Sequence, residues 1–141
     1  MKIKLNCLIP ELYVSDIEAS LIFYSHLDFK ILYKREHEKF VFLEREGSQL
    51  MLEESNDDIW KTGVIEMPFG RGVNFQIRVN DVDRLHEVSM KNGFQIYKAI
   101  YEKWYRVNDC LHGHRQFLIQ DPDGYLLRFF QTLGTRETNY G

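Results

Sequence analysis

Three side chains late in the sequence have types and spacing that suit metal binding. Cys110, His112 and His114 alternate in a Cys-x-His-x-His pattern, and thiolates and imidazoles are the ligands that zinc prefers. If this segment is a strand, the two histidines share a face, because side chains two residues apart point to the same side. No fourth ligand is evident nearby, so a polar loop is the favoured interpretation and a metal site the alternative.

Two glutamates could do proton chemistry. Glu11 and Glu53 would form an acid and base pair if their environments separated their pKa values. The favoured interpretation is that they form ion pairs with Arg78 or Arg128 instead. Further acids follow in a short stretch, which is interpreted as a solvated loop or as a field that attracts a cationic ligand; they are Glu54, Asp57 and Asp58.

Two tryptophans, Trp60 and Trp104, stand in irregular, charged segments. An amphipathic ring in such a setting is suited to recognition of a ligand, because loops carry much of the binding function of proteins. Ordinary core or dimer contacts are the alternative. The sequence contains no phosphate-binding glycine loop and no Ser, His, Asp order typical of hydrolases.

An internal repeat positions these residues. Residues 10–29 align with residues 75–94 at an offset of 65, and further along Gly47 aligns with Gly124 and Leu50 with Leu127 at an offset of 77. The second half therefore contains about 12 extra residues between its second and third strands. Such self-similarity indicates two copies of one supersecondary unit.

Each copy has the signals of a strand, a helix and three further strands. The first strands are expected at residues 8–14 and 73–79, and the N-terminus is expected to lead into them through a strand-like run. The helices that follow are expected to begin with a capping box at Ser15 and with Asp81 as the N-cap. These signals predict an α+β fold of two βαβββ modules, about residues 7–55 and 72–133, which form a curved mixed eight-stranded sheet in a single domain of residues 1–141.

Strand alternation assigns the faces of this sheet. The apolar face, which should pack under the helices, is expected to carry Pro10, Leu12, Val14, Leu50, Leu52, Phe75, Ile77, Val79, Leu127 and Phe129. The opposite face mixes polar and aromatic side chains and is where a ligand is expected; it carries Ile9, Glu11, Tyr13, Met51, Glu53, Asn74, Gln76, Arg78, Arg128 and Phe130.

Composition limits the function classes. The hydrophobic fraction of 44% and the length of 141 residues suit one globular domain. The net charge is −3 and no basic stripe is present, which argues against nucleic acid as a partner. No apolar run is long enough to span a bilayer, and no signal peptide is recognised. Two cysteines, Cys7 and Cys110, indicate reduced thiols and a cytoplasmic protein.

At these motifs the sequence resembles the vicinal oxygen chelate superfamily, which includes glyoxalases, dioxygenases and bleomycin resistance proteins. The resemblance covers roughly residues 8–133. It rests on Val14-Ser-Asp-Ile, on Leu27-Asp-Phe, on Val79-Asn-Asp-Val and on Asp121-Pro-Asp-Gly-Tyr-Leu-Leu-Arg-Phe. The shared fold hosts many activities, so the resemblance alone does not identify one.

The resemblance also indicates where a metal ion would bind. In metalloenzymes of this superfamily the ligands lie on the first and last strand of each module, and the corresponding residues here are Ile9, Met51, Asn74 and Arg128. None of them is a usual ligand, and Arg128 would bring a positive charge to the cation. We therefore expect no metal, no cofactor and no catalytic residue, although a glyoxalase-type or dioxygenase-type enzyme stays the alternative.

The metal-free branch of bleomycin resistance proteins is the part of the superfamily that the chain resembles further. The resemblance implies a homodimer that sequesters a planar, cationic antibiotic of bleomycin type without modifying it. It also implies a binding cleft with aromatic and acidic side chains. The expected ligand-binding residues are Tyr33, Phe40, Trp60, Trp104, Tyr105, His112, Glu11, Glu53, Asn74 and Arg128. A non-catalytic binder of another aromatic metabolite is a further alternative.

Overall fold

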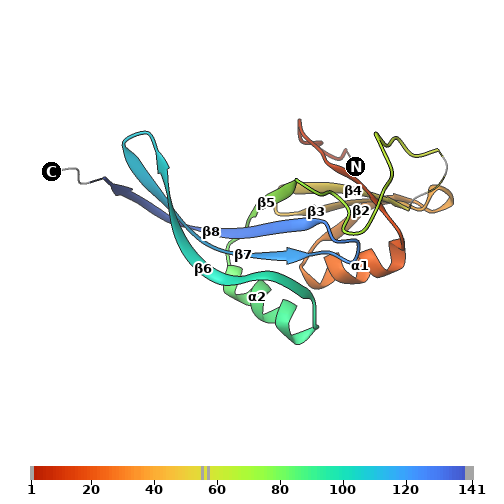
Figure 1. The fold of residues 1–141 in the computed structure, drawn as a ribbon. Helices are drawn as coiled ribbons and strands as arrows, with labels where there is room; N and C mark the ends of the chain where they lie inside the picture. Colours follow the sequence, from red (N-terminus) through yellow and green to blue (C-terminus); the bar gives the residue numbers. More distant parts are fainter. Residues whose placement is uncertain (1, 55, 57, 139–141) are drawn as a thin grey trace. The chain divides into compact units, whose positions relative to one another are not determined.

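The computed structural model describes residues 2–54, 56 and 58–138, and the chain divides into two compact units. Unit 1 consists of Met1–Phe69 with Pro122–Gly124, and unit 2 of Gly70–Asp121 with Tyr125–Gly141. The described residues form β1 (Glu11–Val14), α1 (Ile17–His26), β2 (Lys30–Arg35), the 3-10 helix η1 (Glu36–Glu38), β3 (Phe40–Arg45), β4 (Ser48–Glu54), β5 (Asn74–Arg78), α2 (Val82–Lys91), β6 (Gln95–Val107), β7 (Cys110–Gln120) and β8 (Leu126–Glu137) (Figure 1).

The two units have the same topology. The sheet of unit 1 has the strand order β1-β4-β3-β2, and that of unit 2 has the order β5-β8-β7-β6. In each sheet the first strand pairs parallel with the last, and the other pairs are antiparallel. The expected α+β class and the two βαβββ modules are thereby confirmed, and the eight strands form two four-stranded mixed sheets.

The core of each unit lies between its helix and one face of its sheet. In unit 1, Val14, Tyr24, Leu27 and Leu52 are fully buried, and the ring of Tyr24 meets that of Phe29 edge to face at 5.4 Å. In unit 2 the fully buried apolar residues are Val82, Leu85, Phe117, Ile119, Leu127 and Phe129. The expected apolar faces are confirmed for most of their members, because strand alternation placed them correctly.

The start of α1 differs from the expected capping box. Asp16 is the N-cap, and its carboxylate accepts hydrogen bonds from the backbone N–H groups of Glu18 at 3.0 Å and Ala19 at 3.3 Å. The prediction that Ser15 caps this helix is wrong, because the Ser15 hydroxyl donates a hydrogen bond to the Asp123 carboxylate instead, at 2.5 Å. The expected cap of α2 is confirmed, since Asp81 accepts from the backbone N–H of Arg84 at 3.1 Å.

The first strand of each unit is shorter than expected. β1 begins at Glu11 and β5 at Asn74. Residues 8–10, expected at the start of the first strand, lie outside β1, and the segment before β1 is held by side chains, since Gln49 donates to the carbonyl of Lys4 at 2.8 Å. Side-chain contacts of this kind have no periodic signal in a sequence.

The extra residues of unit 2 lengthen its strands. β6 and β7 have 13 and 11 residues, whereas β2 and β3 have 6 each. The favoured interpretation of Cys110, His112 and His114 as a polar loop is therefore wrong, because all three lie in β7. Figure 1 shows these long strands running past α2 to form a hairpin.

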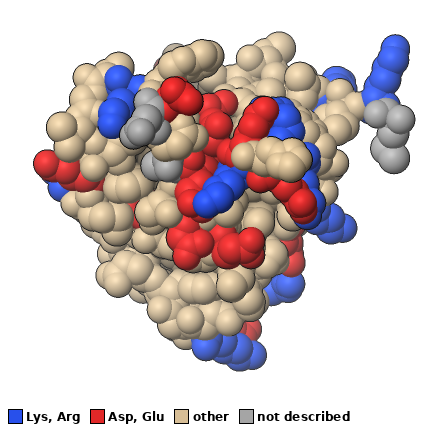
Figure 2. Space-filling view, turned by 90° about the vertical axis from the view of Figure 1, so that its right-hand side faces the viewer, with Lys and Arg blue, Asp and Glu red and all other residues tan. Residues whose placement is uncertain are grey.

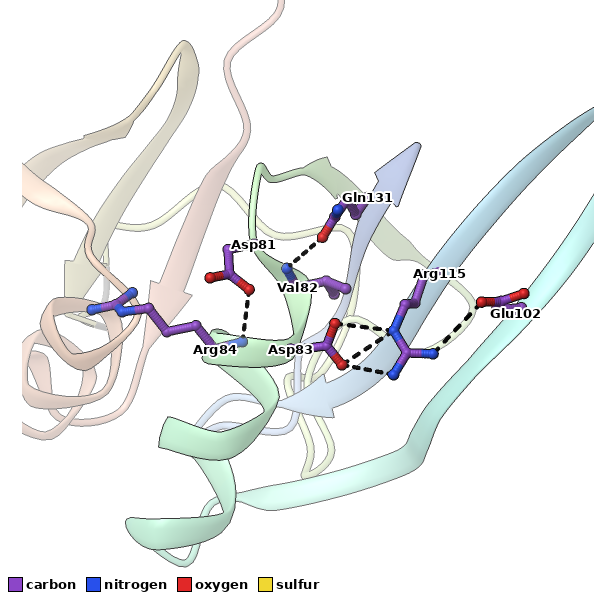
Figure 3. A network of polar contacts seen from close by, with 7 residues as sticks. All are labelled: Asp81, Val82, Asp83, Arg84, Glu102, Arg115 and Gln131. Atoms are coloured by element: carbon purple, nitrogen blue, oxygen red, sulfur yellow. Dashed lines mark hydrogen bonds and ion pairs between the residues drawn. The ribbon is translucent and has the colours of Figure 1, made fainter. Parts of the chain in front are cut away.

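Polar contacts fix the first turn of α2 to its sheet (Figure 3). Arg115 of β7 makes a two-pronged pair with Asp83, with distances of 2.7–3.1 Å, and reaches Glu102 of β6 at 3.8 Å. The Gln131 side chain accepts a hydrogen bond from the backbone N–H of Val82 at 3.1 Å. These contacts hold the helix at one place along the long strands.

No helix among the described residues is long and apolar enough to cross a membrane.

Candidate functional site

The sheet of unit 1 turns one face away from α1, and strand register defines its members. Glu11 lies beside Met51 and Tyr13 beside Glu53 in the parallel pair, while Phe40 lies opposite Glu53 in the antiparallel pair. Residues that lie opposite one another share a face. The prediction that Glu11, Tyr13, Met51 and Glu53 occupy one polar and aromatic face is confirmed; we call it the acidic face.

Aromatic rings cover one side of the acidic face. The Tyr33 ring stacks on Phe42 at 5.0 Å with an angle of 16°, and it also meets Phe40 at 5.9 Å. A register shift in β2 between Ile31 and Tyr33 places Tyr33 opposite Phe42. Phe40 and Phe42 are buried, whereas Tyr33 keeps part of its ring exposed. Of the two aromatic residues expected here, Tyr33 is thus available to a ligand and Phe40 supports it.

Negative charge is crowded beside these rings. Burial, together with the charges of Glu11 and Glu38, raises the pKa of Glu53, and the nearby guanidinium of Arg35 opposes this effect. Burial likewise raises the pKa of Tyr13, a hydrogen bond from the backbone of Trp60 opposes this, and Glu11 and Glu53 add to the rise. A cation placed here would relieve this repulsion.

Trp60 lies beside the acidic face. Its backbone N–H donates to the hydroxyl of Tyr13 at 3.1 Å, while its side chain is 87% exposed. A large exposed indole next to carboxylates has an apolar surface to offer a ligand. Of the other acidic residues expected to attract a cationic ligand, Asp58 is exposed and Asp57 lies outside the described residues.

Glu54 has a different role from Glu53. Its carboxylate accepts from the Lys39 ammonium at 2.9 Å and from the backbone N–H of Ile17 at 3.1 Å. These two contacts lower its pKa. The Glu54 carboxylate therefore stabilises the start of α1, and it has fewer free acceptor positions for a ligand than the Glu53 carboxylate has.

A groove of about 460 Å³ lies on the other side of the sheet of unit 1, and Figure 2 views the end of the molecule where the β2–β3 connection lies. Acidic and basic side chains are intermixed there (Figure 2). Lys34 pairs with Glu36 at 2.9 Å, as Lys39 does with Glu54, so these charges satisfy one another. The groove residues are Ile17, Glu18, Leu21, Lys34, Glu36, Lys39, Phe40, Val41 and Glu54.

The sheet of unit 2 has a corresponding face with different chemistry. Arg128 lies beside Gln76 in the parallel pair and donates a hydrogen bond to its side-chain oxygen. Gln116 lies opposite Phe130 and donates to the hydroxyls of Tyr101 and Tyr105, both at 2.6 Å. We call this the basic face; Asn74, an expected site residue, lies at its edge and is exposed.

Two further expected site residues lie in the hairpin of unit 2. Trp104 lies opposite Gly113, so close that a Cβ there would come within 2.6 Å of the indole, and the Arg136 guanidinium stacks on its ring at 3.7 Å. Trp104 is thus held in a structural contact. His112 lies opposite Tyr105 on the neighbouring strand.

The positions that correspond to the metal ligands of the superfamily's metalloenzymes do not offer a metal-binding set of side chains. Ile9, which lies just before β1 rather than in it, has no donor atom, Met51 has only a weak thioether, and Arg128 is a cation that hydrogen-bonds Gln76. Among the described residues no group of three His, Cys, Asp or Glu is placed to hold a metal ion, and this includes the Cys110, His112, His114 pattern. The residues present do not fit the metal centre of the metalloenzymes that the sequence resembles.

Sequence reasoning missed several members of these two faces. The charges of Arg35 and Glu38 shift the pKa of Glu53. Arg35 is the last residue of β2 and Glu38 lies in η1, and the sequence does not reveal the geometry of this connection between β2 and β3. Phe42 has the same strand parity as Phe40, and Gln116 has the parity opposite to that of the core residue Phe117, so strand parity could have identified both. The ion pairs expected for Glu11 and Glu53 with Arg78 or Arg128 would join the two units and stay a prediction.

Comparisons with known proteins give a family and a fold. The family model described as Glyoxalase/Bleomycin resistance protein/Dioxygenase superfamily matches residues 6–129. No curated protein matches significantly.

Among solved structures, a bleomycin resistance determinant encoded on the transposon Tn5 has 20% identity and a TM-score of 0.62, over 92% of this chain and 99% of that one. TioX from Micromonospora sp. ML1 has 19% identity and a TM-score of 0.68, over 89% of this chain and 98% of that one. A third protein, from Alicyclobacillus acidocaldarius, has 21% identity and a TM-score of 0.64, over 91% of this chain and 92% of that one.

Proposed function

Since the chain belongs to the glyoxalase/bleomycin resistance protein/dioxygenase superfamily, we propose that it binds and sequesters a planar, cationic small molecule of bleomycin type without modifying it. A protein of this kind confers antibiotic resistance by lowering the free concentration of the drug. The acidic face of unit 1 is the proposed site for the cationic part of the ligand.

The observation that carries the proposal is the crowding of Glu53. Glu11 and Glu38 raise its pKa, and within unit 1 the cation that acts on it is Arg35, which is already paired with Glu38 at 2.6 Å. A site that holds several carboxylates together at a cost in free energy is suited to a cationic ligand, because the ligand removes that cost. Tyr33 and Trp60 supply aromatic surface beside these charges, and stacking on such rings adds about 0.5–1.5 kcal/mol per pair.

We propose that the protein does not modify its ligand, because of the side chains at the positions that would bind a metal. Ile9, Met51, Asn74 and Arg128 would neither hold a divalent cation nor activate water on one. The same site could accept another cationic aromatic metabolite, since the described contacts select ring and charge rather than one compound.

We further propose that the protein is a cytoplasmic homodimer whose binding clefts take residues from both chains. Both cysteines are free thiols in the structure, which suits a reducing compartment.

A binding titration tests the proposal. Bleomycin is titrated into the wild type and into Glu53→Gln, with Glu87→Gln as a control, because Glu87 is an exposed glutamate of α2 in unit 2. Loss of one charged contact should weaken binding about three- to tenfold in Glu53→Gln and leave Glu87→Gln unchanged. Wild-type binding should also weaken with added salt.

The bleomycin proposal fails if wild type at saturating drug shows no thermal stabilisation, where about 2.7 kcal/mol is expected at 100 times the dissociation constant. It also fails if Glu53→Gln and Glu87→Gln bind equally well. A cationic aromatic compound without bleomycin's other groups then tests whether the acidic face selects a different ligand.

A further inference from the structure

The basic face of unit 2 contains three buried polar atoms that make no hydrogen bond of ordinary geometry within the described residues. They are the side-chain oxygen of Gln116, Nδ1 of His114 and Nε of Arg128. The first two belong to side chains that interact with each other, since a hydrogen bond with the Gln116 side chain raises the pKa of His114. Buried polar atoms in folded proteins are nearly always hydrogen-bonded, so Nε of Arg128 is the atom that calls for a missing partner.

Strand register places the three side chains in a row along one face. Gln116 lies opposite Phe130, and on the antiparallel strands Arg128 (opposite Leu118) lies on one side of this pair and His114 (opposite Thr132) on the other. The ring of His114 stacks on that of Phe130 at 4.3 Å with an angle of 22°, and the ring of Tyr105 meets it at 5.2 Å. The unpartnered atoms are therefore flanked by aromatic rings.

Gln116 shows that this is a built site rather than a surface accident. Its side chain is fully buried, and its amide nitrogen already donates to two tyrosine hydroxyls at 2.6 Å. The amide cannot rotate away without losing these bonds. With its oxygen and nitrogen exchanged, the oxygen would accept from the two hydroxyls and the nitrogen could donate to the imidazole of His114, with which the Gln116 side chain interacts.

Arg128 determines the charge of the missing group. One Nη donates to Gln76, and no carboxylate among the described residues of unit 2 pairs with the guanidinium. Around Arg128 the described strands of unit 2 contribute no aspartate or glutamate to this face: β5, β7 and β8 supply Gln76, Arg78, His114, Gln116, Leu118, Arg128 and Phe130, and β6 supplies Lys98, Tyr101, Lys103 and Tyr105. A guanidinium with a free Nε favours a planar anion, because its donors match carboxylate geometry.

We propose that the basic face of unit 2 is a binding site for an aromatic carboxylate. The carboxylate accepts hydrogen bonds from Arg128, and the ring lies against Phe130, His114 and Tyr105. A hydrogen-bond donor next to the carboxylate, such as a ring N–H, pairs with the Gln116 oxygen. This site differs from the acidic face in charge and does not depend on the function proposed there.

The charge state of His114 is consistent with this site. Burial and the positive charge of Arg128 lower its pKa, and a hydrogen bond with the Gln116 side chain has the opposite effect. The imidazole is thus neutral at neutral pH, which lets one ring nitrogen accept and the other donate. A bound carboxylate would offset the charge of Arg128 and raise the pKa of His114 towards its ordinary value.

Two matched probes test the proposal by calorimetric titration. Indole-2-carboxylate combines the ring, the anion and an adjacent N–H, and indole-2-carboxamide has the same shape without the charge. We expect the carboxylate to bind wild type at least about tenfold more tightly than the carboxamide, since charge-assisted hydrogen bonds are roughly twice as strong as neutral ones.

Variants assign the charge to one residue. Arg128→Gln should weaken binding of the carboxylate about tenfold and that of the carboxamide less than twofold, while Arg128→Lys should keep part of the charge effect. Arg84→Gln is the control, because Arg84 is an exposed arginine of α2, which packs on the other face of this sheet; its effect should stay below about twofold. Each variant is checked for an unchanged unfolding transition before titration.

A histidine NMR titration supplies a local readout. Indole-2-carboxylate should raise the pKa of His114 in wild type but not in Arg128→Gln. The proposal is overturned if the carboxylate binds no more tightly than the carboxamide, if Arg84→Gln has the same effect as Arg128→Gln, or if the resonances of His114 do not respond. These outcomes are independent of bleomycin binding, which the Glu53 variant measures separately.

Discussion

Glu53 carries a cost in folding stability that the proposed cationic ligand would relieve. Its pKa is raised because burial and the neighbouring carboxylates disfavour the charged form, which means that its ionisation destabilises the folded state. Sites that bind charged ligands commonly carry such strain, and relief of the strain contributes to ligand affinity. The free energy of unfolding and the binding free energy should therefore respond in opposite directions to one substitution.

We predict that Glu53→Gln stabilises the free protein at neutral pH by about 0.2–1 kcal/mol, a modest amount because the carboxyl is only partly buried. The folded-state pKa lies above the unfolded one, so the gain is full above the folded-state pKa and vanishes below the unfolded value, near pH 4. Urea unfolding across this pH range measures it. A loss of stability at neutral pH in Glu53→Gln would contradict the electrostatic account.

At the scale of elements, Trp104 and Gly113 fix the hairpin of unit 2. They lie directly opposite on β6 and β7, and Gly113 in turn lies opposite Gly134 on β8. The indole occupies the space that a side chain at position 113 would need. Packing of an aromatic ring over a glycine is a known way to stabilise a glycine in a sheet.

We predict that Gly113→Ala destabilises the protein by about 1–3 kcal/mol, because its Cβ would come within 2.6 Å of the Trp104 ring and displace it. Gly63→Ala is the control, since a Cβ there meets nothing within 4 Å. Both free energies of unfolding are measured in urea. Equal stability of the two variants would show that Trp104 does not rest on Gly113.

The elements also show how far the sequence could be used for prediction. Alternation and the repeat predicted both modules, the apolar faces and the place of Glu11 and Glu53, because these features follow from local periodicity. Local signals favour a cap at Ser15 over the observed cap at Asp16, because the hydrogen bond from the Ser15 hydroxyl goes to Asp123, which is distant in sequence. The bulge that places Tyr33 on Phe42 and the burial of Gln116 are likewise set by pairing between strands.

At the scale of the whole molecule, the first prediction concerns metal content. The protein purified without chelators should contain well under one equivalent of zinc, nickel, manganese or iron per chain, because Ile9, Met51, Asn74 and Arg128 offer no suitable set of ligands. Elemental analysis measures this. About one equivalent of metal, whose removal by a chelator abolishes an activity, would favour the alternative of an enzyme with other ligands.

The second whole-molecule prediction is the homodimer. Leu8 and Val64, both in unit 1, are large apolar side chains that are 83% and 84% exposed. We propose these two side chains as contacts with a second chain, because exposed apolar surface is buried at interfaces and closed symmetry makes a dimer the expected assembly.

We expect sedimentation at about 10 µM to give twice the chain mass of 16.9 kDa, and the double variant Leu8→Glu with Val64→Glu to shift towards the monomer, because charges at an apolar contact must be desolvated. Exposed positions tolerate glutamate in the folded monomer, so the variant should keep its unfolding transition as a folded chain. If the clefts take residues from both chains, the dissociated variant also loses ligand affinity, although Glu53 is intact. A wild type that sediments as a monomer and still binds its ligand would refute both the dimer and the shared cleft, and would leave the acidic face of a single chain as the complete site.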